Sequence, residues 1–456
     1  MKIAFHTLGC KVNQYETEAM KEKFKKNNHE IVNENDFADV YIINTCTVTS
    51  LADRKSRQYI RRMKKINPES IVAVTGCYAQ MSPEEVSAIE AVDIVTGTNQ
   101  KNRLVELVEN YKKTPEAHTE RVVDEYEQLC EYEETGIITS MESRTRAYIK
   151  LQEGCNRFCS YCIIPYARGQ VRSRAVSEVI KEAKSLIERG VKEIILTGIN
   201  TALYGTEEGF NKENVTDNDI WGIEIIINEL ERLEGDFRIR LSSLEPTVIN
   251  GEYVERLLKY KRLCPHLHLS IQSGSNKILK DMNRKYDREE YLDIVHALKG
   301  YDSGYGITTD IIVGFPGETE EDFKDSLNII REVQFCKVHA FKYSKREGTK
   351  AASMKGHVAP EVKNRRSEEL IATGNKVSEQ FFKSNLNTYR TVLIEEYIEE
   401  MDCLAGYTEN YIKAYIKCNA DSGSYDKELL LNTFAEVKLT ELYRDGILCQ
   451  LKGQSQ

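Results

Sequence analysis

Short apolar runs alternate with amphipathic stretches in the first quarter of the chain. KIAFHT (2–7), VYIINT (40–45) and SIVAVTG (70–76) have the character of strands. Each strand is followed by a segment with a helical pattern, namely 14–27, the stretch from about Ser50 and the stretch near Pro83. This alternation predicts a doubly wound parallel sheet, whose ligand sites lie beyond the carboxyl ends of its strands.

The alternation resumes at Arg144 and continues through six strand–helix units. The candidate strands are AYIKLQ, EIILTG, FRIRLSS, HLHLSIQ, ITTDIIVGF and KVHAFKYS, with helices such as 176–189 and 320–333 between them. Six units predict a partial (β/α)6 form of the eight-unit α/β barrel, with its active site at the carboxyl ends of the strands.

The last part of the chain has a different pattern. A helical stretch at 360–384 precedes the β-branched and tyrosine-rich segments TYRTVLIEEY, YIKAYIKC and TFAEVKLTELY, which predict a small C-terminal β-barrel or sheet. Between the first two patterns, Glu116 to Glu134 carries eight acids and one arginine, as expected of a linker. The predicted organisation is an α/β chain with a first domain at 1–112, an acidic linker at 113–143, a barrel at 144–374 and a C-terminal domain at 375–445.

Composition narrows the class of protein. The chain has 456 residues, and no apolar run approaches the roughly 20 residues of a membrane helix. It begins with a strand pattern and not with a secretion signal, so we expect a cytoplasmic protein without a membrane partner. Its 12 cysteines are then expected to serve metal binding or catalysis and not disulfides.

The net charge of −9 argues against general coating of nucleic acid, but basic residues gather locally. Arg54 to Lys65 contains seven basic residues and no acid, and Arg144 to Arg174 contains seven against one acid. Such segments suit an anionic polymer substrate, or are simply solvated helix faces. Both interpretations remain open from the sequence.

Cys155, Cys159 and Cys162 follow the first barrel strand at spacings of four and three. Three thiolates would leave one iron of a 4Fe–4S cube without a protein ligand, and a small molecule could bind there. A zinc site is the rival interpretation, but zinc prefers a fourth ligand and paired Cys-x-x-Cys halves. A 4Fe–4S cluster is therefore the favoured prediction.

A second set of three cysteines lies in the first domain. Cys10, Cys46 and Cys77 each follow the carboxyl end of a predicted parallel strand. Because these ends converge, the three thiols are expected to meet and hold a second cluster, the alternative being three buried core cysteines. The other six are expected to be ordinary thiols: Cys130, Cys264, Cys336, Cys403, Cys418 and Cys449.

The string Cys-x-x-x-Cys-x-aromatic-Cys at 155–162 resembles the radical S-adenosylmethionine superfamily. The resemblance implies that the open iron binds the amino and carboxylate groups of S-adenosylmethionine, and that an electron from the cluster releases a 5′-deoxyadenosyl radical. Tyr161 matches the aromatic position whose backbone contacts adenine, although its side chain could also simply pack over the cluster.

TLGCKVNQYETE, NTCTVT and TGCYAQ, followed by the three-cysteine loop, resemble the methylthiotransferase family over nearly the whole chain. The resemblance implies a C-terminal TRAM domain that binds RNA, and Cys10, Cys46 and Cys77 as ligands of an auxiliary cluster that presents sulfur. One S-adenosylmethionine would supply methyl and a second the radical. It also implies as partners the anticodon arm of tRNA, an electron donor such as flavodoxin or ferredoxin, and a sulfur source.

GCKVNQYETE is similar to the group that acts on N6-threonylcarbamoyladenosine at position 37 of tRNA. The alternatives are isopentenyladenosine in tRNA, an aspartate of a ribosomal protein, or, in another class, a non-enzymatic iron–sulfur protein for electron transfer or RNA binding. Residues 375–456 hold nine basic against 13 acidic side chains, so the helix at 54–65 is the stronger candidate for gripping the anticodon arm.

Further barrel strings match the family at predicted strand ends. The candidates for cofactor or substrate contacts are Asn200, Glu245, Gln272, Arg284 and Asp310. Gly314 and Gly317 are expected to form a tight turn near the cofactor.

Overall fold

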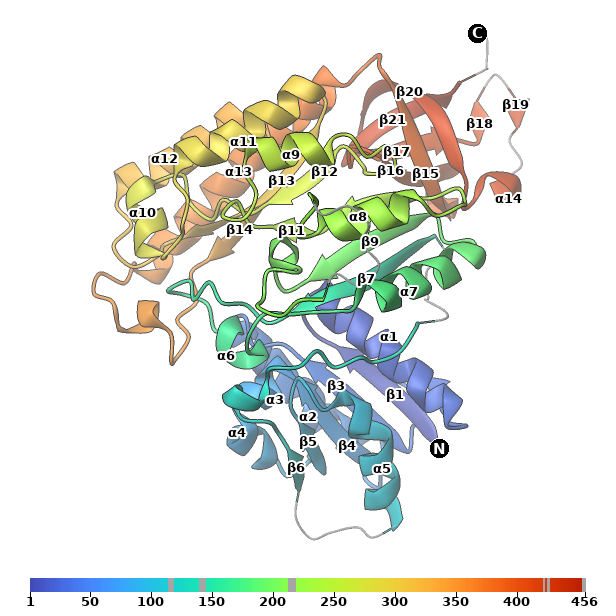
Figure 1. Cartoon of the computed structure of the whole chain (residues 1–456), viewed down its shortest axis with the longest axis vertical. Coiled ribbons are helices and arrows are strands. Elements are labelled where there is room, and N and C mark those ends of the chain that lie inside the picture. Colours follow the sequence, from blue (N-terminus) through green and yellow to red (C-terminus); the bar gives the residue numbers. More distant parts are fainter. Residues whose placement is uncertain (114–118, 139–144, 212–218, 421–422, 425–426, 453–456) are drawn as a thin grey trace.

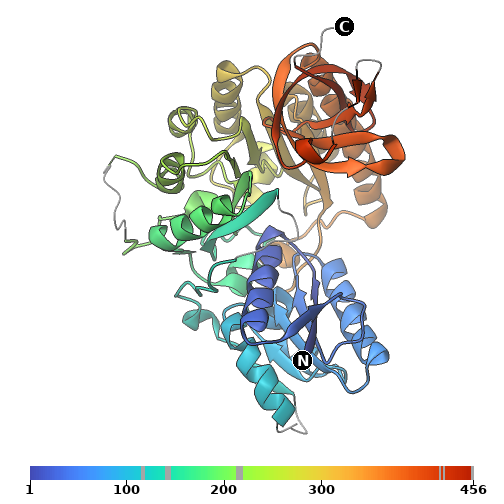
Figure 2. The same ribbon diagram turned by 90° about the vertical axis from the view of Figure 1, so that its right-hand side faces the viewer.

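The computed structural model describes residues 1–113, 119–138, 145–211, 219–420, 423–424 and 427–452. Three bodies follow one another along the chain: an N-terminal sheet with its helices, a half-open barrel, and a small closed barrel (Figures 1 and 2). Arg144 and parts of the predicted linker, 114–118 and 139–143, lie outside the described residues. None of the described helices is long and apolar enough to cross a membrane.

The N-terminal sheet has six parallel strands in the order β2-β1-β3-β4-β5-β6. The strands are β1 (Lys2–Thr7), β2 (Glu30–Val32), β3 (Val40–Thr45), β4 (Ile71–Gly76), β5 (Ile94–Thr96) and β6 (Glu120–Val122). The helices are α1 (Lys11–Lys26), α2 (Ser50–Ile66), α3 (Cys77–Met81), α4 (Pro83–Ser87) and α5 (Leu104–Lys113). β3 and β4 are wholly buried because helices cover both faces of the sheet.

Strand β6 lies inside the stretch predicted to be a linker. It pairs with β5 at the edge of the sheet, and Val122 and Val123 pack on the two cores of the first domain. A three-residue edge strand in an acidic sequence has no periodic signal, which explains why the sequence did not predict it.

The central barrel has the six predicted strands, all parallel where they pair: β7 (Arg146–Glu153), β9 (Glu193–Gly198), β10 (Arg238–Leu241), β12 (His266–Leu269), β13 (Gly306–Val313) and β14 (Lys337–Lys342). They form two sheets, β10-β9-β7-β8 and β11-β12-β13-β14, connected by a bridge between Ile239 and Leu263. The short strands β8 (Arg172–Ser173) and β11 (Ser243–Leu244) complete these sheets. The predicted partial (β/α)6 barrel is confirmed.

Helices cover the outer side of this barrel (Figure 1). They are α7 (Val176–Glu188), α8 (Glu224–Glu231), α9 (Gly251–Leu257), α10 (Asn276–Asp281), α11 (Arg288–Tyr301), α12 (Glu320–Val333) and the long α13 (Pro360–Ser384). Their apolar faces and those of the strands form the largest core of the molecule. The short helix α6 (Ile164–Arg168) follows the three-cysteine loop and packs against α3 of the N-terminal domain.

The C-terminal part is a closed barrel in the order β15-β16-β17-β21-β20, as predicted. Its strands are β15 (Tyr389–Ile398), β16 (Cys403–Thr408), β17 (Lys413–Lys417), β20 (Phe434–Tyr443) and β21 (Gly446–Leu451). The shorter elements β18 (Asn419–Ala420), β19 (Gly423–Ser424) and α14 (Lys427–Leu430) lie between β17 and β20. Helix α13 links the two barrels, because Leu370 and Val377 belong to the core of the first and Phe381 to the core of the second.

Candidate functional site

Three cysteines lie where the N-terminal strands end. Cys10 is the N-cap of α1 after β1, Cys46 follows β3, and Cys77 begins α3 directly after β4. The strand order reverses between β1 and β3, which is where open parallel sheets bind ligands. Gly76 lets the chain before Cys77 pass close to the end of β3. Its φ is +94°, and a Cβ there would lie 2.5 Å from the carbonyl oxygen of Thr45.

Burial sets the protonation of these thiols. Burial and the neighbouring Cys77 and Cys10 raise the pKa of Cys46 to about 12. The pKa of Cys77 is also raised by burial, although the guanidinium of Arg168 opposes this. Cys10 remains exposed. The three sulfurs are thus near enough to interact, and two of them are kept neutral unless a positive partner compensates their charge.

The second set lies in one loop at the end of β7. Gly154 opens the loop with a φ of +72°, and a Cβ at this position would lie 1.7 Å from the carbonyl oxygen of Gln170. The Cys155 N–H donates to Gly169 O (3.1 Å), and the Cys162 N–H to Cys159 O (2.9 Å). Ser160 fastens the loop to the end of α10 by donating from its N–H to Met282 O (2.9 Å). Side-chain direction in the loop is therefore fixed by the backbone.

These three thiols are also within electrostatic reach of one another. Burial raises the pKa of Cys155 to about 12, and Cys159 adds to the effect. The pKa values of Cys159 and Cys162 are likewise raised by burial, which Arg284 opposes at Cys159. The Arg284 Nη1 donates to Cys159 Sγ at 3.5 Å, so a cationic side chain already stands against this sulfur.

Three of the five predicted barrel contacts meet beside this loop. The Asn200 Nδ2 donates to Glu245 Oε2 at 2.6 Å, and the Arg284 Nη1 donates to Glu245 Oε1 at 2.7 Å. Arg157 from the cysteine loop lies 3.5 Å from the same carboxylate. Glu245 thus connects the end of β9, through Asn200, with the residues around Cys159.

Gln272 and Asp310 lie on the other sheet of the barrel. The Gln272 N–H donates to Asp310 O at 2.9 Å, and Gln272 has a φ of +70°. The Asp310 carboxylate accepts from Ser270 at 3.0 Å and lies 3.1 Å from His268 Nε2. In the described part of the chain these two residues form no hydrogen bond or ion pair with Asn200, Glu245 or Arg284, and their role stays a prediction.

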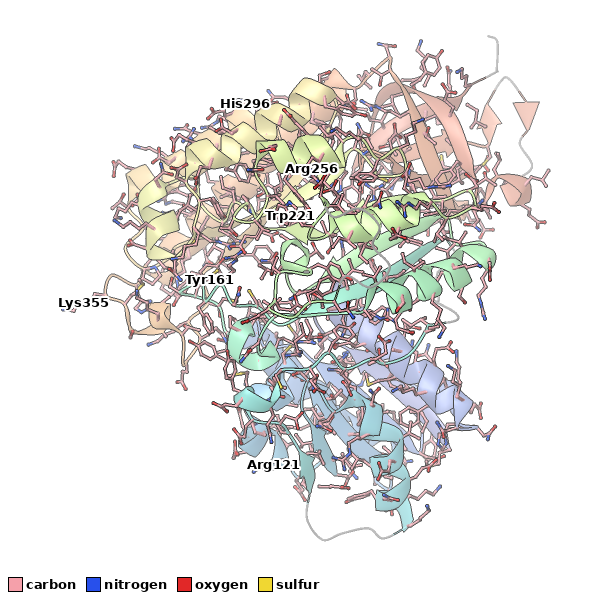
Figure 3. The ribbon with its side chains drawn as sticks, in the orientation of Figure 1. Arg121, Tyr161, Trp221, Arg256, His296 and Lys355 are labelled. Atoms are coloured by element: carbon pink, nitrogen blue, oxygen red, sulfur yellow. The ribbon has the colours of Figure 1, made fainter. Side chains whose placement is uncertain are left out.

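Tyr161 packs into a small apolar cluster. Its ring meets that of Phe315 edge to face at 6.4 Å, in a cluster that includes Ile278 and Met282. Figure 3 places Tyr161 on the side of the barrel that faces the N-terminal sheet. Gly314 and Gly317 have φ values of +73° and +81°, which fits the predicted turn.

Each of the two sets offers three thiols, the donor type that iron–sulfur clusters bind. Among the described residues, no three His, Cys, Asp or Glu side chains are arranged to hold one metal ion. In each set an arginine donates to one sulfur: Arg168 to Cys77 in the first set and Arg284 to Cys159 in the second.

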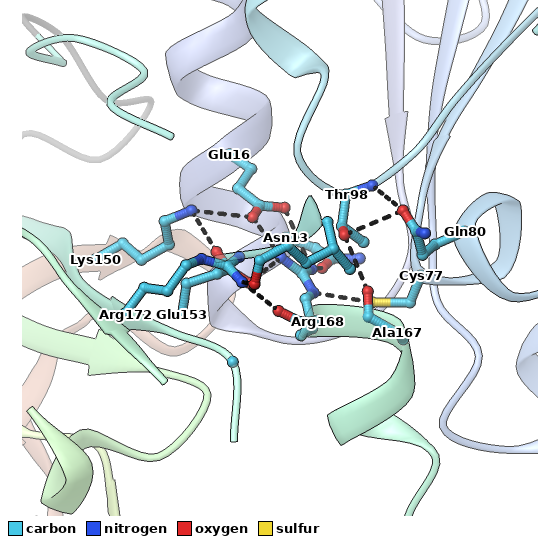
Figure 4. Close-up of polar contacts among 12 residues, drawn as sticks. Asn13, Glu16, Cys77, Gln80, Thr98, Lys150, Glu153, Ala167, Arg168 and Arg172 are labelled. Carbon is cyan, nitrogen blue, oxygen red and sulfur yellow. Dashed lines mark hydrogen bonds and ion pairs between the residues drawn. The ribbon is translucent and has the colours of Figure 1, made fainter. Parts of the chain in front are cut away.

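Sequence reasoning missed the polar residues between the two cysteine sets. Arg168 is fully buried and contacts Asn13, Glu16, Cys77 and Glu153, while Lys150 contacts Glu16 and Glu153 (Figure 4). The interpretation of 144–174 as a solvated or RNA-facing basic surface is wrong for Lys150, Arg168, Arg172 and Arg174, which are all buried. Counting charge along the sequence cannot distinguish a cation on the surface from one paired inside.

Helix α2 keeps part of its predicted basic surface. Arg57 pairs with Glu85, Lys64 with Asp93, and Arg62 donates to Asn35. Arg54, Lys55, Arg61 and Lys65 are exposed on this helix.

The sequence matches the Radical SAM superfamily over residues 149–330 and Uncharacterized protein family UPF0004 over residues 2–97. It is 44% identical to the threonylcarbamoyladenosine tRNA methylthiotransferase MtaB of Bacillus subtilis, over 92% of this chain and 91% of that protein. The chain belongs to the tRNA methylthiotransferase family. A tRNA-2-methylthio-N(6)-dimethylallyladenosine synthase of Alkaliphilus oremlandii is 37% identical over 86% of this chain and 82% of that protein.

This tRNA methylthiotransferase family member is therefore a radical SAM enzyme, a class that uses S-adenosylmethionine with 4Fe–4S clusters. Among solved structures, the radical S-adenosylmethionine methyltransferase TsrM from Kitasatospora setae matches with a TM-score of 0.57 at 13% identity, over 77% of each chain. The cobalamin-dependent radical enzyme OxsB matches with a TM-score of 0.51 at 13% identity, over 82% of this chain and 56% of that one. Both show a shared fold and no more.

Proposed function

We propose that this enzyme converts N6-threonylcarbamoyladenosine at position 37 of tRNA to its 2-methylthio derivative. The supporting observation is the pairing of two three-cysteine sets, one at the β7 loop and one at the N-terminal strand ends, with Arg168 between them. Relatives named for threonylcarbamoyladenosine reach 44% and 39% identity, which favours this nucleoside over dimethylallyladenosine.

In this proposal, Cys155, Cys159 and Cys162 hold the cluster that cleaves S-adenosylmethionine, and this cluster supplies the electron for the cleavage. Arg284 would hold the Cys159 sulfur through its N–H donor, and it also donates to Glu245 beside the loop. Further positions offered for S-adenosylmethionine or substrate are Tyr161, Asn200, Glu245, Gln272 and Asp310.

Cys10, Cys46 and Cys77 would hold the auxiliary cluster that delivers sulfur. Cys46 and Cys77 are buried and anchor one side of this site, whereas Cys10 is exposed at the start of α1. The site is therefore closed toward the sheet and accessible from the side of Cys10, as sulfur delivery to a large substrate requires.

The tRNA would meet the exposed cations of α2, because phosphate contacts come from Lys and Arg and the C-terminal barrel is acidic. An electron donor such as flavodoxin or ferredoxin and a sulfur source complete the reaction, which we place in the cytoplasm. The proposed domains are those predicted at 1–112, 144–374 and 375–445, except that the first extends through β6 to residue 122. The boundary between 374 and 375 falls within α13.

Mass analysis of tRNA nucleosides tests the substrate. A deletion strain complemented with this chain should regain the 2-methylthio derivative of threonylcarbamoyladenosine, and a C159A variant should not restore it. Restoration of 2-methylthio-dimethylallyladenosine alone would assign the other nucleoside. Reduced, reconstituted protein that leaves S-adenosylmethionine intact would favour a non-enzymatic iron–sulfur protein.

A further inference from the structure

Arg168 joins the two cysteine sites directly. It ends helix α6, six residues after Cys162, yet its Nε donates to Cys77 Sγ at 3.1 Å (Figure 4). Its Nη2 donates to Asn13 Oδ1 at 2.7 Å, and its Nη1 to Glu153 Oε1 at 2.8 Å. Glu153 is the last residue of β7, from which the loop with Cys155 departs. One guanidinium therefore contacts a candidate ligand of one cluster and the strand end that carries the other.

Buried charges of both signs surround Arg168. The buried cations Arg168, Lys150 and Lys101 pair with two buried carboxylates, Glu16 and Glu153. A buried cation without a counter-charge is costly, because the low dielectric inside a protein does not replace its hydration. The Arg168 guanidinium donates to Glu16, Glu153 and Asn13 through Nη1 and Nη2, and its Nε donates to the sulfur of Cys77.

A nearby arginine shows that sulfur contact is not a general property of this segment. Arg172 is also buried, but its Nη1 donates to the backbone carbonyls of Leu129, Arg168 and Gln170 and to no cysteine. A planar guanidinium with five donors can serve a sulfur and two carboxylates at once, whereas the three donors of a lysine ammonium all radiate from one nitrogen.

We propose that Arg168 is a positioning residue that fixes the separation of the two clusters and sets the reduction potential of the auxiliary cluster through its N–H···S bond to Cys77. This inference rests on the proposed function, since it requires Cys77 to be a cluster ligand. A hydrogen bond to a ligand sulfur, with a positive charge behind it, favours the reduced cluster, which carries more negative charge. Removing this donor therefore lowers the reduction potential.

The test uses the full chain with C155A, C159A and C162A, which leaves only the N-terminal site to be reconstituted. Iron content and the electron paramagnetic resonance of this parent establish first whether Cys10, Cys46 and Cys77 bind a cluster. A parent without iron would defeat the proposed function itself, before Arg168 is changed.

R168K is then compared with R172K as its matched control. A redox titration should show the oxidised-to-reduced ratio of R168K shifted at least tenfold toward the oxidised form at a given potential, about 59 mV for a one-electron couple. R172K should titrate like the parent. An R168K cluster that titrates like the parent would overturn the proposed setting of the potential.

The separation is measured in the chain with all its cysteines, by the magnetic coupling between the two reduced clusters. R168K should broaden the distance distribution, and R172K should not. If R168K takes up no auxiliary cluster, the double variant E16Q/R168Q is measured in its place. It removes one charge of each sign and so keeps the net charge of the site. Loss of this cluster in both, while R172K retains it, would support the positioning role and reject the tuning of the potential.

Discussion

The two cysteine sites use opposite ways of bringing three sulfurs together. Cys155, Cys159 and Cys162 lie within one loop, whose shape depends on its own backbone hydrogen bonds and on Gly154. Cys10, Cys46 and Cys77 come from three strands, and only the completed sheet brings them together. A local site can be recognised from its spacing and disrupted by one local change, whereas a dispersed site depends on topology.

The largest expected effect comes from removing one cysteine of each set. C159A should abolish cleavage of S-adenosylmethionine, whereas C77A should retain cleavage and lose methylthio transfer. Each variant should bind roughly four irons in place of roughly eight, because each loses one 4Fe–4S cluster. Anaerobic reconstitution with iron analysis and 5′-deoxyadenosine measurement gives both readouts. Loss of both clusters from either variant would contradict the independence of the two sites.

G154A should disrupt the loop site alone. The substitution places a side chain at a φ of +72° and a Cβ 1.7 Å from Gln170 O, so the loop must move. The backbone conformation alone costs about 1–3 kcal/mol. Iron content should fall to that of C159A, with the N-terminal cluster retained.

G209A is the matched control for G154A. Gly209 also has a positive φ, +80°, but no atom lies within 4 Å of a Cβ built there. It should keep both clusters. If G209A and G154A lose iron equally, backbone conformation and not the close contact determines the loop.

A smaller effect, on tRNA affinity, is expected from changing the exposed cations of α2. Replacing Arg54, Lys55, Arg61 and Lys65 by alanine should weaken tRNA binding roughly tenfold or more and lower its salt dependence. K181A/K184A, on exposed positions of α7, should bind like the wild type. Filter binding at several salt concentrations measures both. Equal losses in the two variants would remove α2 as the specific surface.

The smallest expected effect is a loss of stability at low pH, when the buried carboxylates Glu153 and Glu16 become protonated. Burial alone would raise the pKa of Glu153, but Arg168 and Lys150 outweigh it and lower this pKa to about 2. Glu16 is shifted down in the same way, against its own burial, by Arg168 and Lys101. Because both folded values lie below the ordinary 4.5, their stabilisation is present above pH 4.5 and is lost as the pH falls toward 2.

Hydrogen exchange of α1 as a function of pH tests this expectation. Protection of α1 should fall between pH 4.5 and 2, and E153Q should make the fall shallower. E84Q removes the exposed pair of Glu84 with Arg121 and should leave the curve unchanged. An identical curve for E153Q and the wild type would contradict a role for this carboxylate.

The sequence predicted regular elements and local motifs well, and interior charge poorly. The six barrel strands and α12 are signalled by apolar periodicity, which the structure confirms. Strand β6 is too short for a periodic signal, and only its pairing with β5 in the folded sheet makes it a strand. Asn200, Glu245 and Arg284 contact one another, whereas Asp310 contacts Ser270 on the other sheet. The motifs place all four residues at predicted strand ends, but they do not indicate which of these residues contact each other. Arg168 resembled its basic neighbours because burial is a property of the fold.

The position of Arg168 in the chain also imposes an order on biosynthesis. The ribosome makes the N-terminal strands and all three of their cysteines before it makes residue 168. Until that residue has emerged and folded back, Cys77 lacks its guanidinium donor and Glu16 lacks two of its three cations, those of Lys150 and Arg168. The N-terminal site is therefore completed by a residue of the central barrel, and its final geometry has to wait for that part of the chain to be made.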